Sequence, residues 1–317
     1  MIASSAATKP PISRYVQSDA CVRLPYAYTG QSGVLGWSGL LPTMVITDPE
    51  FQWLRHWVRE QLGIHLSEQK RELVVGRLQA LLREQGFASF HAYCHALQQD
   101  TSGHALNELV NRITTNYTYF YREPAHFEFL WREVFPPLTR ILRQQNNRDL
   151  RLWSAGCSTG EEAYLLAMLQ MDYLGAEYPQ WRAGVLATDI SQPVLEWAKA
   201  GIYSAEHLER LPDGLRRKYF QPQPDCQTFR VHPSVRDQVV FRRLNLMNPR
   251  FPFRKPFQVI FCRNVMIYFD EATRRGLLSR LHQCLEPGGY LFIGHAESLG
   301  RQRDDFEYIL PAVYRRR

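Results

Sequence analysis

A glycine-rich turn followed by two acids is the segment with the clearest capacity for chemistry. It reads Gly156-Cys157-Ser158-Thr159-Gly160, and Glu161 and Glu162 follow it directly. Glycines let backbone approach a ligand closely, and nucleotide-like ligands bind such a turn after the first strand of an open α/β sheet. The spacing matches neither the dinucleotide-binding pattern nor the phosphate-binding loop. Two acids at a helix start favour a cation such as the sulfonium of S-adenosylmethionine, unless they only complement the helix dipole.

Polar residues also follow three other apolar runs. Asp189 lies at the end of one run, Asn245-Leu246 at the end of a later one, and Arg263-Asn264 at the end of the run after that. The carboxyl ends of parallel strands meet at one edge of a sheet, so we expect these residues to line one crevice. An acid in the position of Asp189 accepts hydrogen bonds from ribose hydroxyls, or else caps the next helix.

The elements that must position these residues alternate between two periodicities. β-rich runs at 150–156, 183–191, 239–246, 257–265, 288–298 and 307–316 are separated in part by helical segments at 161–174, 193–200 and 271–285. This order predicts an α/β fold with a doubly wound, mostly parallel sheet covered on both faces. No helix separates the last two runs, so the final strand is expected to be an antiparallel edge strand.

The first third of the chain has a different pattern. Residues 1–43 are rich in Ser, Gly, Pro and Thr, and are expected to form a disordered tail. Thr47 and Glu50 form a capping-box pattern before a helix that Gly63 ends, and two further helices are expected at about 67–85 and from Ser89. We therefore expect a helical domain from residue 44 to about 103. Lys70, Arg71 and Arg77 lie on one side of its second helix, as a solvated face or as a docking face for an acidic helix.

Composition limits the function classes. The chain has 317 residues, 45% of them hydrophobic and 22% charged, which is typical of a globular protein of about two domains. Its 38 Lys and Arg against 31 Asp and Glu leave +7, without a basic block that would select nucleic acid. Six cysteines contain no C-x-x-C pair, and no apolar stretch approaches the ~20 residues of a membrane helix. We expect reduced thiols, no metal and a cytoplasmic protein.

Four sequence blocks, in order and at matching spacing, resemble the chemotaxis receptor glutamate methyltransferases of the CheR type. They are Thr115-Asn116-Tyr117-Thr118-Tyr119-Phe120-Tyr121-Arg122-Glu123, Trp153-Ser154-Ala155-Gly156-Cys157-Ser158-Thr159-Gly160-Glu161-Glu162, Phe261-Cys262-Arg263-Asn264-Val265-Met266-Ile267-Tyr268-Phe269-Asp270 and Phe292-Ile293-Gly294-His295-Ala296-Glu297-Ser298. The resemblance covers about residues 46–314.

The resemblance implies a seven-stranded methyltransferase domain over residues 104–317, with a small antiparallel β insert at about 204–241. It also implies that S-adenosyl-L-methionine donates a methyl group to glutamate carboxylates on the cytoplasmic helical bundle of methyl-accepting chemoreceptors. The products are glutamate methyl esters and S-adenosyl-L-homocysteine. We expect a monomer that binds no nucleic acid and does not insert into membranes.

The resemblance also implies the site residues by matched position. Arg122 and Tyr268 would lie beside the transferred methyl, although Arg122 could instead pair with Glu123 or Glu128 at the surface and Tyr268 could be a core aromatic. The implied cofactor contacts are Asn116, Thr118, Arg122, Glu162, Asp189, Asn245, Leu246, Arg263 and Asn264.

One region departs from the family pattern. In some members the β insert binds a receptor's C-terminal tether peptide through a Gly-rich loop followed by Arg-Val-Arg. Here residues 221–233 are short, contain no glycine and read Arg230-Val231-His232 at that point. We therefore expect methylation that is independent of a tether peptide.

Two alternatives remain open from the sequence. A nucleic-acid methyltransferase shares the fold, but an exocyclic-amine enzyme usually has an N-P-P-Y-like turn where this chain has Asn245-Leu246-Met247-Asn248-Pro249, and no Pro-Cys dipeptide is present for cytosine chemistry. A non-catalytic signalling adaptor would not need to retain Arg122, Glu162, Asp189 and Tyr268.

Overall fold

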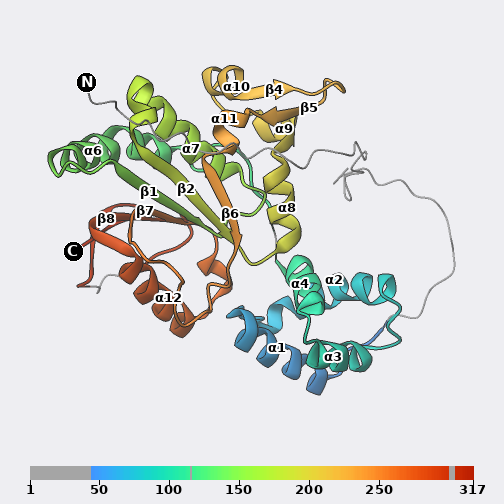
Figure 1. Ribbon diagram of the computed structural model, residues 1–317. Helices are drawn as coiled ribbons and strands as arrows, with labels where there is room; N and C mark the ends of the chain where they lie inside the picture. The colour runs from blue at the N-terminus through green and yellow to red at the C-terminus, as the bar shows by residue number, and fades with distance from the viewer. Residues whose placement is uncertain (1–43, 115, 300–303) are drawn as a thin grey trace, which may run out of the picture. The chain divides into compact units, whose positions relative to one another are not determined.

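The computed structural model describes residues 44–114, 116–299 and 304–317, so the predicted tail at 1–43 lies outside the described residues. The described chain has a small helical domain followed by an α/β domain (Figure 1). This is the predicted fold class.

Four α-helices and one 3₁₀ turn build the helical domain: α1 Asp48–Leu62, η1 Glu68–Lys70, α2 Arg71–Glu84, α3 Phe90–Gln99 and α4 His104–Ile113. The predicted capping box is present, since Thr47 and Glu50 each bond to the other's backbone. Leu109, Val110 and Ile113 of α4 are buried in the same hydrophobic core as α1, α2 and α3. The helical core therefore extends beyond residue 103, where the sequence placed the boundary, because α4 is amphipathic and buries its apolar face against the earlier helices.

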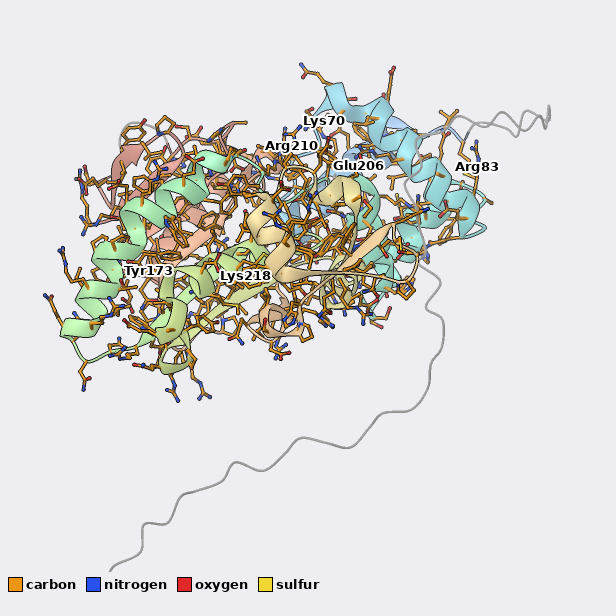
Figure 2. The ribbon with its side chains drawn as sticks, turned by 90° about the horizontal axis from the view of Figure 1, so that it is seen from above. Lys70, Arg83, Tyr173, Glu206, Arg210 and Lys218 are labelled. Atoms are coloured by element: carbon orange, nitrogen blue, oxygen red, sulfur yellow. The ribbon has the colours of Figure 1, made fainter. Side chains whose placement is uncertain are left out.

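The basic side of α2, whose two ends are marked by Lys70 and Arg83 in Figure 2, is mostly engaged within its own domain. Arg71 pairs with Asp48 at 2.6 Å and Glu68 at 3.1 Å. Arg77 donates a hydrogen bond to the carbonyl of Ile113 at 3.2 Å. Two of the three basic side chains therefore stabilise the helical domain, which favours the solvated-face interpretation.

The main sheet has seven strands in the order β6-β2-β1-β7-β8-β10-β9. Their bounds are β1 Asp149–Ala155, β2 Arg182–Asp189, β6 Val239–Arg243, β7 Phe257–Cys262, β8 Leu285–Ile293, β9 Phe306–Leu310 and β10 Val313–Arg316. The first five in this order are parallel, β10 is antiparallel to β8, and β9 is antiparallel to β10. The mostly parallel sheet is confirmed, but the final predicted strand is a hairpin. Ala312, with φ 65°, makes the turn, so the edge strand is β9 rather than the last strand.

Helices cover both faces of this sheet (Figure 1). Leu152 and Val259 are buried in the core of one face, whereas their neighbours Trp153 and Ile260 are buried in the core of the other. Strands buried on both faces need nearly continuous apolar runs, as β7 has. The covering elements are α5 Pro124–Phe129, η2 Leu130–Val134, α6 Phe135–Gln144, α7 Glu161–Leu174, η3 Gly175–Gln180, α8 Gln192–Ala200 and α12 Glu271–Cys284.

A second sheet of three short antiparallel strands, in the order β3-β5-β4, forms the insert. It consists of β3 Ile202–Ser204, α9 Ala205–Leu208, α10 Asp213–Tyr219, β4 Phe220–Pro222, β5 Thr228–Val231 and α11 Pro233–Arg236. Lys218, which is labelled in Figure 2, pairs with Asp172 of α7, and the hydroxyl of Tyr219 donates a hydrogen bond to the same carboxylate. These contacts anchor α10 to the main domain. The predicted end of the insert at about residue 241 is too late, because β6, which begins at Val239, pairs with β2 in the main sheet.

The helical domain contacts the loops that follow β6 and β7. The backbone N–H of His65 donates to the carbonyl of Tyr268 at 2.7 Å, and the Asn245 amide donates to the carbonyl of Gln61 at 2.8 Å. Arg59 pairs with Asp270 at 2.7 Å. Tyr268 lies in η4 Met266–Tyr268, so the helical domain helps to position it. Among the described helices, none has the length and apolar character to cross a bilayer.

Because the helical domain contacts the second domain at Gly63, we expect substitution of this glycine to lower stability more than substitution of Gly86, which also has a left-handed backbone conformation. Gly63, with φ 70°, ends α1, and a Cβ there would collide with Met247 Sδ and lie 2.9 Å from Thr273 Cγ2. Gly86, with φ 74°, follows α2 and has open space around it. Backbone strain alone should cost Gly86→Ala roughly 1 kcal/mol. Gly63→Ala should cost at least about 1 kcal/mol more because the contact with the second domain must also shift.

Urea denaturation of both variants and the wild type measures this difference in the free energy of unfolding. Equal losses for the two substitutions would show that the contact of Gly63 with Met247 contributes nothing.

Candidate active site

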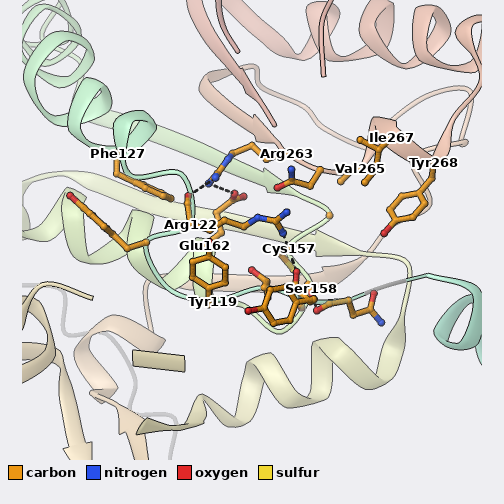
Figure 3. A pocket seen from close by; sticks show the side chains of 16 residues that line it. Tyr119, Arg122, Phe127, Cys157, Ser158, Glu162, Arg263, Val265, Ile267 and Tyr268 are labelled. Carbon is orange, nitrogen blue, oxygen red and sulfur yellow. Dashed lines mark hydrogen bonds and ion pairs between the residues drawn. The ribbon is translucent and has the colours of Figure 1, made fainter. Parts of the chain in front are cut away.

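Two adjoining cavities lie at the carboxyl edge of the main sheet. The larger has a volume of about 400 Å³ and is shown in Figure 3; the smaller has about 100 Å³. Asn116, Gly156, Val265 and Tyr268 line both, so the two cavities form one elongated site.

All site residues that the family resemblance implied line one or both cavities. The larger cavity is lined by Asn116, Thr118, Arg122, Glu162, Arg263, Asn264 and Tyr268, and the smaller by Asn116, Asp189, Asn245, Leu246 and Tyr268. Loops separated by more than a hundred residues in the chain therefore meet at the edge predicted from the strand ends.

The glycine turn is packed against the loop after β7 and against helix α8. Gly156 has φ 82°, and a Cβ there would collide with Val265 Cγ2. Gly160 has φ 97°, and a Cβ there would lie 2.8 Å from the Cβ of Ala198. Glycine is required at both positions, because a side chain would push the turn away from the strands and close the cavity beside it.

Asp189 lines the smaller cavity and does not cap the next helix, because Ser191 is the N-cap of α8. Its Oδ1 accepts a hydrogen bond from the N–H of Ser191 at 3.0 Å, and its Oδ2 accepts one from the N–H of Ser158 at 2.9 Å. Burial raises the pKa of Asp189, and these backbone donors oppose that shift. A carboxylate oxygen has two lone pairs, so each oxygen can accept a further hydrogen bond from a ligand hydroxyl.

The two adjacent glutamates have different environments. Glu162 lines the larger cavity and accepts hydrogen bonds from Ser154 Oγ at 2.7 Å and Arg263 Nη1 at 3.1 Å. Glu161 is fully buried, lines neither cavity and accepts a hydrogen bond from Thr159 Oγ1 at 2.7 Å. Burial raises the pKa of Glu161 to about 7. The interpretation that both acids face a cationic ligand is therefore wrong for Glu161.

Arg263 is a buried guanidinium between two carboxylates. Its side chain is 3% exposed and pairs with Glu162 and Glu123, each at 3.1 Å. It also donates to the carbonyl of Arg122 and lies over the ring of Phe127 at 5.2 Å. Burial raises the pKa of Glu162 and its pairing with Arg263 opposes that shift, whereas Arg263 holds the pKa of Glu123 below its ordinary value. Of the two carboxylates, only that of Glu162 lines the cavity and can face a cationic ligand.

Arg122 and Tyr268 lie on two sides of the larger cavity (Figure 3). Arg122 Nη1 donates a hydrogen bond to the carbonyl of Tyr117 at 3.0 Å. Within the described part of the chain Arg122 forms no ion pair, so the interpretation as a surface pair with Glu123 or Glu128 is not met. Tyr268 also packs against the core of the helical domain. It is therefore both a residue that lines the cavity and, in part, a core aromatic.

Two acids of the site were missed as functional candidates, although both stand in the sequence blocks that resemble the family. Glu123 is described above. Glu297 accepts hydrogen bonds from the N–H groups of Asn264 at 3.0 Å, Gly294 at 2.6 Å and Ile267 at 3.1 Å. It thereby holds the loop that carries Arg263 and Tyr268. Their position inside the blocks was the available signal, but no chemical pattern separated them from ordinary surface acids.

Glu123, His126 and His295 place potential ligand atoms within 4.8 Å of one another. Burial lowers the pKa of His126 to about 3, so its imidazole is neutral. We assign no metal to this cluster, because Glu123 already accepts hydrogen bonds from Arg263 and the positive charge of Arg263 would repel a cation.

Comparisons with known proteins agree with this geometry. Residues 116–314 match the family model of the CheR methyltransferase SAM-binding domain, and residues 49–114 match that of the CheR methyltransferase all-alpha domain. The chain is 42% identical to a chemotaxis protein methyltransferase of Borreliella burgdorferi, over 86% of this chain and 95% of that protein. It is 35% identical to one of Escherichia coli, over 86% and 92%. It is 38% identical to chemotaxis protein methyltransferase 2 of Pseudomonas aeruginosa, over 81% and 91%.

The burial of Glu161 predicts a pH-dependent term in stability. A carboxyl whose pKa is about 7 in the folded chain, against an ordinary 4.5, binds more protons when folded. It therefore contributes stability at low pH that is lost as the pH rises through 7. Glu161→Gln removes this term, so the variant should lose about 1 kcal/mol relative to wild type as the pH falls from about 8 to 6.

Urea denaturation of both proteins at several pH values checks this expectation. A constant difference between them across that range would mean that Glu161 titrates as an ordinary glutamate.

Proposed function

Since the chain belongs to the CheR methyltransferase family and is an S-adenosylmethionine-dependent methyltransferase, we propose that it methylates glutamate side chains on the cytoplasmic helices of chemoreceptors. The proposed product is a glutamate methyl ester. The observation that carries the proposal is a single cavity that holds both the Glu162 carboxylate and the guanidinium of Arg122. Such a site suits a cationic donor and an anionic acceptor together.

The residues present fit S-adenosylmethionine. The chain offers two connected cavities, with the Glu162 carboxylate in the larger and the Asp189 carboxylate in the smaller, and a glycine turn at which they meet. Glu162 suits the positively charged methionine part, and Asp189 suits the ribose hydroxyls. We propose that Asn116, Thr118, Arg122, Asn245, Leu246, Arg263 and Asn264 complete this binding site. When bound, the cofactor supplies a methyl group attached to a positively charged sulfur.

Methylation of a carboxylate requires no general acid or general base from the protein. A glutamate side chain has a pKa of about 4.3, so at neutral pH it is already a nucleophilic carboxylate and needs no general base. The protein must instead hold the carboxylate in line with the methyl group and remove water from it. Such positioning can contribute roughly 7–11 kcal/mol to lowering the barrier.

We propose that Arg122 orients the incoming carboxylate through charge-assisted hydrogen bonds. One of its nitrogens is occupied by the carbonyl of Tyr117, so the guanidinium is fixed in direction while other N–H groups remain to donate. A clamp that neutralised the carboxylate completely would stabilise the ground state and slow the reaction. Because the Arg122 guanidinium already donates one hydrogen bond to the carbonyl of Tyr117, it can orient the carboxylate without stabilising the ground state as strongly.

Tyr268 is proposed to define the opposite side of the reaction centre, by facing the sulfonium or donating to the acceptor oxygen. Its backbone carbonyl is held by His65 of the helical domain, and the loop before it is held by Glu297. The helical domain therefore takes part in shaping the acceptor side of the site.

We propose that receptor methylation does not depend on a tether peptide bound to the β insert. β4 is an edge strand of three residues that ends in Pro222, and proline has no N–H to donate to an added strand. The turn between β4 and β5 closes on Asp225, which accepts hydrogen bonds from Gln227 and Thr228. This edge offers few backbone groups for strand addition.

The function is tested by methyl transfer from radiolabelled cofactor to purified cytoplasmic receptor fragments. We expect label in protein that base releases as methanol, which is characteristic of carboxyl methyl esters. A fragment with its surface glutamates replaced by alanine, and a total RNA sample, serve as negative controls. Base-stable label, or label in RNA, would contradict the proposal.

Arg122→Ala should lower the rate of methyl transfer by at least about 100-fold, because the acceptor is no longer oriented. The affinity for S-adenosylmethionine should change by less than about threefold, since Glu162 and Asp189 are untouched. Calorimetry and the transfer assay measure the two quantities separately. Arg140→Ala, at an exposed position of α6, is the control. Equal losses of transfer and cofactor affinity would make Arg122 a cofactor ligand only.

Peptides matching the last residues of receptors in the same cell should not bind the protein with micromolar affinity. Titration by fluorescence anisotropy measures this directly. Micromolar binding that is lost when residues 220–231 are exchanged for a glycine-serine loop would overturn the proposed independence from a tether.

A further inference from the structure

Arg122 stands in a strained turn. The residues on both sides of it, Tyr121 with φ 66° and Glu123 with φ 58°, have left-handed backbone conformations without being glycine. Each such residue costs of order 1 kcal/mol and persists only where its surroundings impose it. The turn therefore needs contacts that hold it, and they should be found at one of the two strained residues.

The carboxylate of Glu123 supplies those contacts. Its Oε2 pairs with Arg263 Nη2 at 3.1 Å, and its Oε1 accepts hydrogen bonds from Asn264 Nδ2 and from the N–H of His295, each at 3.4 Å. The loop after β7 and the loop after β8 are thus both bonded to one side chain that is 15% exposed. Burial opposes the charge of Glu123, but the nearby Arg263 leaves its pKa below the ordinary value.

A second contact holds the same turn from the same partner. Arg263 donates a hydrogen bond to the carbonyl of Arg122, next to its pairing with Glu123. Glu123 does not line either cavity, whereas Arg122 does. Glu123 is therefore within reach of the residue that orients the acceptor and away from the reacting atoms.

We propose that Glu123 is a positioning residue for methyl transfer, which fixes the direction of the Arg122 guanidinium by bonding the strained turn to the loops after β7 and β8. This role rests on the proposed function of Arg122. Without the Glu123 carboxylate the left-handed turn relaxes, and Arg263 keeps only Glu162 as a charged partner. Cofactor affinity is largely kept, because the Glu162 and Asp189 carboxylates remain in the cavities.

A double-mutant cycle between Glu123 and Arg122 tests this inference. Glu123→Ala should lower kcat by about 100-fold and change the KM for S-adenosylmethionine by less than about threefold. In an Arg122→Ala background the same substitution should lower the residual rate by less than about threefold, because the residue through which it acts is gone. If Glu123→Ala also lowered the residual rate by about 100-fold in the Arg122→Ala background, the two substitutions would act independently, and the inference would be overturned.

Glu123→Gln keeps the side-chain shape and one accepting oxygen, so it tests the role should the alanine variant not fold. We expect an intermediate loss of about 10-fold in kcat with the same non-additivity. Glu133→Gln, at an exposed glutamate of the following η2 segment, is the matched control and should leave kcat unchanged. A loss of cofactor affinity as large as the loss of kcat would assign Glu123 to cofactor binding instead.

The result that would contradict the proposed function differs from the result that would contradict the role of Glu123. If the wild type forms no base-labile esters on receptor fragments but methylates another acceptor, the function is wrong and the cycle can still be measured on that acceptor. If the wild type forms the esters and the cycle is multiplicative, only the role of Glu123 is wrong.

Discussion

The pairing of one buried guanidinium with two carboxylates is the interaction on which the rest of the site depends. Arg263 has little access to water and pairs with Glu162 and Glu123. A buried charge with too few partners is costly, and removing either acid would leave Arg263 with a single charged partner. The same three groups join the helix after β1, the turn before α5 and the loop after β7, and the pairing fixes the Glu162 carboxylate at the wall of the cavity.

The second constraint on the site is the need for glycine in the loop after β1, because a larger residue would not fit between that loop and its neighbours. Gly156 and Gly160 let the loop after β1 pass close to Val265 and Ala198, which brings Glu162 to the cavity and turns Glu161 away from it. Two chemically identical neighbours thereby acquire different roles. One helps to balance a guanidinium beside the ligand, and the other is buried with a raised pKa of about 7.

Much of this arrangement could be predicted from local patterns. Strand and helix periodicity predicted a sheet covered on both faces, and the strand ends predicted which residues meet at its edge, as Asp189 and Asn264 do. The role of Glu123 could not be predicted, since its partner Arg263 is 140 residues away and only tertiary structure brings them together. The direction of Glu161 could not be predicted either, because one residue along a helix rotates a side chain by about 100° and burial then decides its charge. The hairpin at Ala312 was hidden for a similar reason, as a left-handed alanine has no sequence signal.

The two sides of the larger cavity, at Arg122 and at Tyr268, are held by different parts of the chain. Arg122 is fixed through Glu123 and Arg263 to the loops of the main sheet, whereas Tyr268 is fixed through His65 to the helical domain and through Glu297 to the loop after β8. A change in how the helical domain contacts the loops after β6 and β7 would therefore move the Tyr268 side of the site and leave the Arg122 side in place. With the roles proposed for Arg122 and Tyr268, methyl transfer needs both sides aligned with an acceptor, so the contacts of the helical domain at Gly63 and Asn245 would also shape the proposed catalytic geometry.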